Sequence, residues 1–412
     1  MTRRDDRSPS AAVPPGAGDG ESRDATERLA ARVARRAAER FGDRPLHELL
    51  GHTLSGSDLT TLLLHAFRHR ARARRFADVR DHAVRTPLLQ ASSADARRMH
   101  AFDTVAFECA SAFEALDLAP VAPLGTSACV GIDPNNVLGA LRFTEVAADP
   151  TTAMALHAAE VRRRARTEEP LRFAASQRVA RLQPVDQPGF SPHFRLFALG
   201  TAARTAADRN GDAVDAEALA EHVDVWVRIF AALPAAGFAI AGTRVVLSDT
   251  RLVRACFAAR GLDATALGRG ARAHRPEAGE SLIAASSVEL PRAVEDPVAA
   301  VTALGLGDTE RGWARTLVGS LVTPLRARHP SLAVRFDLAR LEGIHYYEGA
   351  TIRFFIRRPD GFEVAIGDGG ALAWTRELLS DRRERWVTSA AGAELVVKLF
   401  DGGGPRANGG TA

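Results

Sequence analysis

The scarcity of cysteine limits the chemistry that this sequence supports. Its 412 residues include three cysteines, Cys109, Cys129 and Cys256, which are widely spaced and odd in number. They therefore predict neither a disulfide framework nor a metal-ligand pattern, and we expect no metal site built from the protein's own side chains. Because disulfides are rare in reducing compartments, this cysteine usage favours a cytoplasmic protein.

Lysine is nearly missing as well, since Lys398 is the single lysine and arginine supplies the other basic side chains. The net charge of +4 is small for a chain of this length. No arginine-rich stretch with interleaved aromatic residues stands out, so a biased composition explains the arginines better than nucleic-acid binding does. No run of about 18 apolar residues is present, and we expect no membrane span.

Tyrosine occurs twice, and both copies stand side by side in the stretch LEGIHYYEGATIRFFIRR (341–358). The plain interpretation of Tyr346 and Tyr347 is a strand edge with two half-buried rings. A functional interpretation depends on the motifs that surround the pair.

The ends and the first hundred residues have distinct compositions. Residues 1–25 and 401–412 are rich in Gly, Pro and polar residues, so we expect them to be disordered. Residues 26–99 are rich in Ala and Arg with apolar residues at helical spacing, which predicts an N-terminal helical segment. A longer helix is predicted to end near Leu116, and an extended segment follows because Pro120, Pro123 and Gly125 interrupt helices.

The rest of the chain alternates between strands and helices. Residues 171–182 and 193–204 alternate as half-buried strands and predict a hairpin with a long tip. Residues from about 205 to 330 read as a helical insertion, interrupted by one strand, RVVLS. Two further strands, ATIRFFIRR and FEVAI, are joined by a Pro-Asp-Gly turn, and GDGGALAWTRELL predicts a glycine turn followed by a helix. This order indicates an α+β fold, with an antiparallel sheet flanked by helices.

Four stretches occur in an order that resembles the class II aminoacyl-tRNA synthetase core. FECASAFEALDLAPVAPLGTSA resembles motif 1, and RLQPVDQPGFSPHFRLFALG (181–200) resembles motif 2. EVAADPTTAMALHAA (145–159) matches the acidic strand-to-helix turn of the histidyl group. LEGIHYYEGATIRFF with GDGGALAW is similar to the Arg-Gly-Leu-Asp-Tyr-Tyr and Gly-Gly-Arg-Tyr-Asp stretches of histidyl-tRNA synthetase and its paralogue, the regulatory subunit of ATP phosphoribosyltransferase. The likeness covers residues 100–400.

The resemblance implies a set of site residues. A guanidinium can bind a carboxylate and a phosphate oxygen together, which suits acyl-adenylate formation, and Arg181 stands at the position of the catalytic motif 2 arginine. ATP, with Mg²⁺, would be bound by Arg181, His193, Arg195 and Glu394. The substrate would be bound by Glu145, Asp149, Thr151, Tyr346, Tyr347 and Asp368. Motif 1 further implies a homodimer.

Several positions depart from the family pattern. Glu342 replaces the second catalytic arginine, which inverts the local charge and favours an amine-bearing ligand. His345 replaces an aspartate, and a histidine beside a glutamate is able to act as a base near neutral pH; we therefore add both residues to the catalytic candidates. Ala371 and Leu395 replace two further arginines. These losses argue against tRNA charging as the function of this chain.

Structural interpretations of these residues remain open. Asp149 with Pro150 is also a good helix start, His193 stands where a loop ends, and GDGG is a turn signal. Arg181 and Arg195 alternate with apolar neighbours, as solvent-facing strand residues do.

Two functions are therefore predicted from the sequence. The first is a class II synthetase-like, ATP-dependent ligase that activates a small carboxylate or amino acid through an acyl-adenylate, without charging tRNA. The alternative is a non-catalytic paralogue of histidyl-tRNA synthetase that binds a metabolite and regulates a partner enzyme. The ligase is the preferred prediction, because Arg181 and its hairpin are retained, whereas the loss of other arginines supports the alternative.

Overall fold

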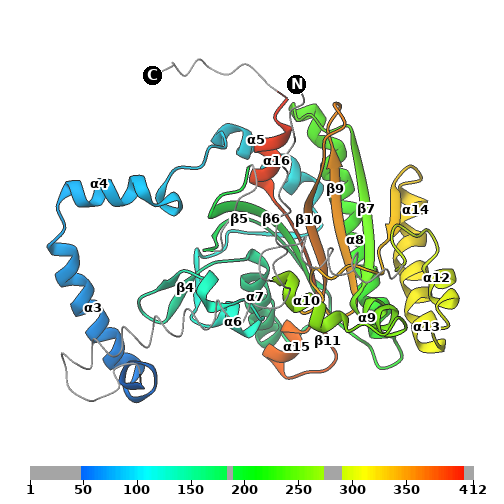
Figure 1. Cartoon of the computed structure of the whole chain (residues 1–412), viewed down its shortest axis with the longest axis horizontal. Coiled ribbons are helices and arrows are strands. Elements are labelled where there is room, and N and C mark those ends of the chain that lie inside the picture. The colour runs from blue at the N-terminus through cyan, green and yellow to red at the C-terminus, as the bar shows by residue number, and fades with distance from the viewer. Residues whose placement is uncertain (1–47, 183–188, 273–289, 403–412) are drawn as a thin grey trace, which may run out of the picture.

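An eight-stranded sheet forms the centre of the protein (Figure 1). The computed structural model describes residues 48–182, 189–272 and 290–402. The strands follow the order β1-β5-β6-β11-β10-β9-β7-β8, with parallel pairing of β1 with β5 and of β7 with β8 and antiparallel pairing elsewhere. Their bounds are β1 Glu114–Leu116, β5 Leu171–Ala180, β6 His193–Arg204, β7 Gly242–Asp249, β8 Ala333–Phe336, β9 Ala350–Arg357, β10 Glu363–Leu372 and β11 Glu384–Ala391.

The first face of this sheet carries the larger core. Alternate strand residues such as Phe197 and Phe354 pack against Trp226 of α8, with ring centroids 5.8 Å and 5.6 Å apart. These apolar contacts exclude water from one side of the sheet over most of its width. The helices that contribute to this core are α5 Ala96–Cys109, α8 Gly211–Ala232, the 3-10 helix Leu233–Ala236, one side of α9 Thr250–Ala258, α12 Pro297–Ala303, α13 Asp308–Leu317, the π-helix Val318–Val322, α14 Thr323–Arg328 and α16 Ala393–Phe400.

The second face is covered by fewer elements. α7 (Pro150–Ala165) and α15 (Trp374–Leu379) pack here around Met154 and Trp386. α9 (Thr250–Ala258) and α10 (Ala264–Arg272) pack against the segment between β8 and β9, through a separate apolar cluster that includes Phe257, Leu341 and Ile344. The tyrosine pair belongs to this second face, because Tyr347 packs in the same cluster as Trp386.

A small sheet and a helical arm complete the described structure. The small sheet has the order β2-β4-β3, with β2 Val121–Pro123, β3 Gly139–Ala140 and β4 Thr144–Val146. The short helix α6 (Thr126–Cys129) follows β2. The arm consists of the π-helix Leu49–Thr53, α3 (Gly56–Arg72), α4 (Phe76–Arg85) and the 3-10 helix Pro87–Leu89, and it extends away from the core in Figure 1.

The predicted α+β class, with a mostly antiparallel sheet and flanking helices, is confirmed. The hairpin of β5 and β6 lies close to its predicted bounds, and RVVLS lies within β7. Within the described residues, no helix has the length and apolar character needed to cross a bilayer. Residues 1–25 and 403–412 of the predicted disordered ends, and residues 26–47 of the helical segment, lie outside the described residues. Asp401, at the start of the predicted tail, is described and forms a β-bridge with Phe238.

Two local predictions were wrong. The helix expected to reach Leu116 ends at Cys109, because a turn at Ala110 lets Phe113 enter the core and residues 114–116 pair with β5 as strand β1. The glycine turn expected at GDGG is instead part of β10, where Gly369 and Gly370 pair with neighbouring strands on both sides. Strands β8 and β11 were not predicted.

Candidate functional site

Asp149 lies at the start of α7 on the second face of the sheet. Its side chain accepts a hydrogen bond from the Thr151 backbone amide at 2.8 Å, so it forms the N-cap predicted from the sequence, with Pro150 as the first helical residue. The Thr151 hydroxyl donates to the same Asp149 oxygen at 2.7 Å. The cap therefore leaves the second carboxylate oxygen of Asp149 available for another partner.

Arg181, directly after β5, provides that partner. Its Nη2 lies 3.2 Å from Asp149 Oδ2, and its Nε donates to the Ala148 carbonyl at 2.9 Å. The guanidinium also lies over the Phe194 ring at 5.4 Å from the centroid, which adds a cation–π contact. These three contacts fix the plane of the guanidinium beside the start of α7.

The tyrosine pair lies against the same helix start. The rings of Tyr346 and Tyr347 meet edge to face with centroids 4.9 Å apart, and Tyr346 also meets Trp374 at 5.5 Å. The Tyr346 hydroxyl also lies near the Thr151 side chain, whose own hydroxyl donates to Asp149. Tyr346, Thr151, Asp149 and Arg181 are therefore gathered at the start of α7.

Burial raises the pKa of both phenols well above the ordinary value for tyrosine, and the nearby negative charges of Asp149 and Asp368 add to this effect. The phenols therefore stay protonated across the physiological range and are able to donate hydrogen bonds. The same electrostatic interactions show that Asp149, Arg181 and Asp368 all act on the Tyr346 hydroxyl.

Asp368 brings a second arginine to this group. Asp368 lies in β10, and its Oδ2 is 3.2 Å from Nη2 of Arg340. The Arg340 side chain is 3% exposed and also donates to the Ile352 carbonyl at 3.1 Å, whereas Asp368 is 48% exposed. The carboxylate is therefore accessible while the guanidinium beneath it is fixed. Arg340 was not among the residues predicted from the sequence.

Glu342 forms a neighbouring ion pair. Its carboxylate lies 3.2 Å from Arg353 of β9, and Arg353 is the register partner of Asp368 across the two strands. Burial opposes ionisation of Glu342, but the charges of Arg353 and Arg340 outweigh it and hold its pKa below the usual range. Glu342 is thus an ionised carboxylate that is already paired.

Two other predicted residues do not join this group. Glu145, in β4, is buried and accepts hydrogen bonds at 2.8 Å from the backbone amides of Gly125 and Ser127, so it caps α6. His345 lies against α10, where its Nε2 is 3.2 Å from the point that a Cβ at Gly268 would occupy.

The remaining predicted ATP-binding residues lie on the first face, away from Arg181. Arg195 shares its face of β6 with Phe197, which packs against α5 and α8, and it pairs with Asp103 at 2.9 Å. His193 contacts Arg178 and the Gln90 carbonyl. Buried Glu394 is engaged by three groups, Ser92 at 2.6 Å, Arg178 at 2.8 Å and Lys398 at 2.8 Å.

The fit of these residues to a nucleotide can be tested directly. His193, Arg195 and Glu394 are held in internal pairs on one face of the sheet, and Arg181 is on the other. As a set of four they therefore do not fit one ATP molecule. Among the residues that the structure describes, no group of three or more His, Cys, Asp or Glu side chains is arranged to hold a metal ion.

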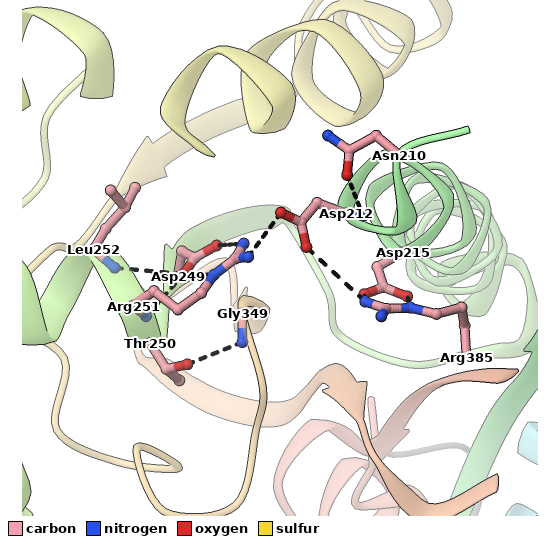
Figure 2. Close-up of polar contacts among 9 residues, drawn as sticks. All are labelled: Asn210, Asp212, Asp215, Asp249, Thr250, Arg251, Leu252, Gly349 and Arg385. Atoms are coloured by element: carbon pink, nitrogen blue, oxygen red, sulfur yellow. Dashed lines mark hydrogen bonds and ion pairs between the residues drawn. The ribbon is translucent and has the colours of Figure 1, made fainter. Parts of the chain in front are cut away.

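A polar network joins the start of α9 to the loop that contains the tyrosine pair (Figure 2). The Thr250 hydroxyl accepts from the Gly349 amide at 3.0 Å and donates to the Tyr347 carbonyl at 3.3 Å. Arg251, the next residue, pairs with Asp249 and with Asp212, both at 2.7 Å. The network then continues from Asp212 to a further ion pair between Arg385 and Asp215.

Comparison with solved structures shows that this fold is similar to that of histidyl-tRNA synthetases, which have a class II aminoacyl-tRNA synthetase core, and to that of an ATP phosphoribosyltransferase regulatory subunit/histidyl-tRNA synthetase. No family model and no curated protein matches the chain. At 20% identity or less, the structural likeness described next establishes the fold alone.

Three solved structures illustrate the similarity. An ATP phosphoribosyltransferase regulatory subunit/histidyl-tRNA synthetase from Bacillus halodurans C is 15% identical, with a TM-score of 0.55 over 73% of this chain and 78% of that chain. A histidine–tRNA ligase subunit from Alicyclobacillus acidocaldarius subsp. acidocaldarius DSM 446 is 20% identical, with a TM-score of 0.55 over 79% and 98%. A histidyl-tRNA synthetase from Nostoc sp. PCC 7120 is 13% identical, with a TM-score of 0.52 over 73% and 69%.

Proposed function

We propose that this chain is a non-catalytic, synthetase-like protein that binds a small metabolite bearing both an amine and a carboxylate, and that it regulates a partner enzyme. The observation that carries the proposal is the pairing of two protonated phenols with two acid–arginine pairs, Asp149 with Arg181 and Asp368 with Arg340. This cluster supplies anionic acceptors, cationic donors and neutral donors on one face of the sheet.

The charges of the cluster define the ligand class. The accessible carboxylate of Asp368 suits an ammonium group, and the Tyr346 hydroxyl and the Arg181 guanidinium suit a carboxylate. A simple organic acid would leave Asp368 with no new partner, and a simple amine would leave Arg181 with none. An amino acid or a similar zwitterion uses both ends of the cluster.

A second candidate function is the ATP-dependent ligase that activates a carboxylate through an acyl-adenylate. It is supported by Arg181, whose guanidinium pairs with Asp149 and whose charge acts on the nearby Tyr346 hydroxyl. ATP with Mg²⁺ would supply the phosphoryl group in such a reaction. The internal pairing of His193, Arg195 and Glu394 is the reason that we rank this function second.

Calorimetry with a panel of amino acids, organic acids and amines, each with and without ATP, tests the proposal. We expect a zwitterion to bind without ATP, and Tyr346→Phe or Asp368→Asn to weaken that binding by about tenfold, the usual effect of one lost charge-assisted hydrogen bond. Asp360→Asn is the matched control, because Asp360 lies in an exposed turn and pairs with Arg358.

The ligase predicts a different result. ATP–pyrophosphate exchange that requires one particular carboxylate and disappears in Arg181→Ala would show that the chain is a ligase. It would then contradict the non-catalytic function. Binding of no zwitterion, together with no exchange, would contradict both functions. A homodimer and a partner enzyme belong to the proposal as well, and light scattering with and without a candidate enzyme measures both.

A further inference from the structure

Gln177 is a buried polar residue on the second face of the sheet, beside the proposed ligand site. It lies in β5 and is 6% exposed. Because side chains alternate between the two faces of a strand, Gln177 shares its face with Ala175 and Val179, two residues to either side. Ala175 packs in the apolar cluster of Tyr347, against which Tyr346 also packs. One neighbour of Gln177 on this face therefore belongs to the surroundings of the tyrosine pair.

The other neighbour leads to Arg181. Val179 packs with Ala147, and the carbonyl of the next residue, Ala148, accepts a hydrogen bond from Arg181 Nε at 2.9 Å. Along β5, Gln177 thus lies between the residue that packs with the tyrosine pair and the arginine that follows the strand. The proposed function uses both of those groups and gives no role to the polar group between them.

One hydrogen bond fixes which way the Gln177 amide is turned. Its Nε2 donates to the Ala119 carbonyl at 2.7 Å. Because a carbonyl oxygen accepts hydrogen bonds and does not donate them, the NH2 group faces Ala119 and Oε1 faces away from it. Ala119 follows β1, the edge strand that pairs with β5. Oε1 therefore lies on the side of the amide that is turned away from this edge of the sheet.

Oε1 of Gln177 is itself buried, and it accepts no hydrogen bond from the residues that the structure describes. Ala175, Val179 and Leu196, the register partner of Gln177 on β6, surround it with apolar groups. A buried acceptor that lacks a donor destabilises the folded state, whereas an apolar side chain of the same size would not. Packing of the core alone therefore does not account for a glutamine at this position.

We propose that Gln177 determines which ligand side chain the site accepts, because Oε1 receives a hydrogen bond from a neutral hydroxyl or N–H group at the end of that side chain. This inference rests on the proposed function, in which Asp368 binds the ammonium of the ligand and Tyr346 and Arg181 bind its carboxylate. Oε1 is covered in this structure, so a ligand reaches it only when neighbouring apolar side chains move.

The chemistry of the amide narrows the ligand class. An amide oxygen carries no net charge, so it pairs well with a neutral donor but does not balance the charge of an ammonium or guanidinium group in an apolar environment. A purely apolar ligand side chain would leave Oε1 without a partner. The preferred ligand is therefore an amino acid whose side chain ends in a neutral hydrogen-bond donor.

Calorimetry with pairs of amino acids that differ mainly in the side-chain donor tests the inference. The pairs are threonine with valine, asparagine with leucine, glutamine with methionine, and histidine with its ring-methylated form, whose neutral ring lacks an N–H. For at least one pair, the wild-type chain is expected to bind the donor-bearing member about tenfold more tightly. Gln177→Met is expected to remove that difference. Gln90→Met is the matched control, because Gln90 is exposed and its Nε2 also donates to a backbone carbonyl, that of Val84, at 2.8 Å.

The ratio of two affinities on one protein separates recognition from stability, because a partly unfolded variant loses affinity for both ligands equally. The wild-type comparison needs no variant, so it decides the matter even where Gln177→Met folds poorly. Equal affinities within every pair overturn the inference and leave the proposed function standing, and so does a preference for the donor that persists in Gln177→Met. Binding of no amino acid overturns the inference together with the proposed function.

Discussion

The ring of Tyr347 occupies the place where a side chain at Gly370 would lie. A Cβ built on Gly370 would meet the Tyr347 ring at 2.5 Å and the Ala350 carbonyl at 2.9 Å. Glycine is unfavourable inside a strand, but here it permits a close approach. The glycine of β10 and the tyrosine of the loop therefore form one structural unit in which the absent side chain of the first makes room for the second.

Substitution of this glycine tests that unit. Gly370→Ala is expected to displace the Tyr347 ring, lower the free energy of unfolding by about 1–3 kcal/mol and weaken ligand binding. Urea unfolding and calorimetry measure the two effects. Gly312→Ala in α13 is the control, because a Cβ there meets no atom within 4 Å and alanine favours a helix. Unchanged stability and binding in Gly370→Ala would contradict the packing of Tyr347 on β10.

The Thr250 hydroxyl is expected to position the tyrosine pair without contacting the ligand. Thr250→Val keeps the shape of the side chain but removes its hydrogen bonds to Gly349 and Tyr347. We expect ligand affinity to fall by about tenfold and stability by about 1–3 kcal/mol, and Thr250→Ser to restore the affinity. Thr104→Val, at an exposed hydroxyl of α5, is the control. Failure of the serine variant to recover binding would argue against a positioning role.

His222 is expected to make the protein sensitive to acid. It is fully buried between the Thr201 hydroxyl at 2.9 Å and the Ser389 hydroxyl at 3.0 Å, and burial, aided by the charge of Arg172, lowers its pKa to about 3. The unfolded chain binds a proton near the ordinary pKa of about 6.5. Between these values the unfolded state holds more protons, so stability falls as pH falls from about 6.5 to about 3.

The loss between about pH 7.5 and pH 5 is expected to reach about 2 kcal/mol from this residue. Chemical denaturation across that range measures it, and His222→Gln is expected to flatten the slope while lowering stability at neutral pH. His82→Gln, on the exposed side of the arm, is expected to leave the slope unchanged. The same slope in wild type and His222→Gln would show that the acid sensitivity arises elsewhere.

Substitution of Glu145 distinguishes its structural role as the cap of α6 from the substrate-binding role predicted from the sequence. Its carboxylate accepts two amide hydrogen bonds at 2.8 Å, and Glu145→Gln replaces one acceptor oxygen with a donor that cannot satisfy these amides. We expect a loss of about 1–3 kcal/mol in the free energy of unfolding with unchanged ligand affinity. Thermal unfolding and calorimetry measure the pair of effects, and weaker binding at unchanged stability would favour the substrate role instead.

The sequence predicted those features whose cause is local. Strand alternation located β5 and β6, and an aspartate before a proline located the start of α7. The acidic turn, Arg181 and the tyrosine pair were named together because their motifs are recognisable, and the structure brings them together. The predicted helix before β1 was too long because two of the three turn residues that follow its actual end, Ala110 and Ala112, are alanine, the best helix former.

Features that depend on the pairing register of the strands could not be predicted from the sequence. Arg178 and Arg195 are paired across β5 and β6, and this register determines that Arg195 lies on the face away from Arg181. A shift of one residue would have exchanged the faces, and the twelve residues between β5 and β6 prevent the register from being deduced from the sequence. Arg340 was missed for a related reason: it lies in the segment between β8 and β9, and its partner Asp368 is 28 residues away on β10.

The environment of Lys398 has a consequence for chemical modification. This lysine is 9% exposed and is held by Glu394 and by the Ser191 hydroxyl. Acylating reagents, and enzymes that attach acetyl groups or ubiquitin to lysine, therefore find no accessible ε-amine on the folded chain. The rate at which Lys398 becomes acylated would report how often α16 separates from the tip of the hairpin, without any introduced label.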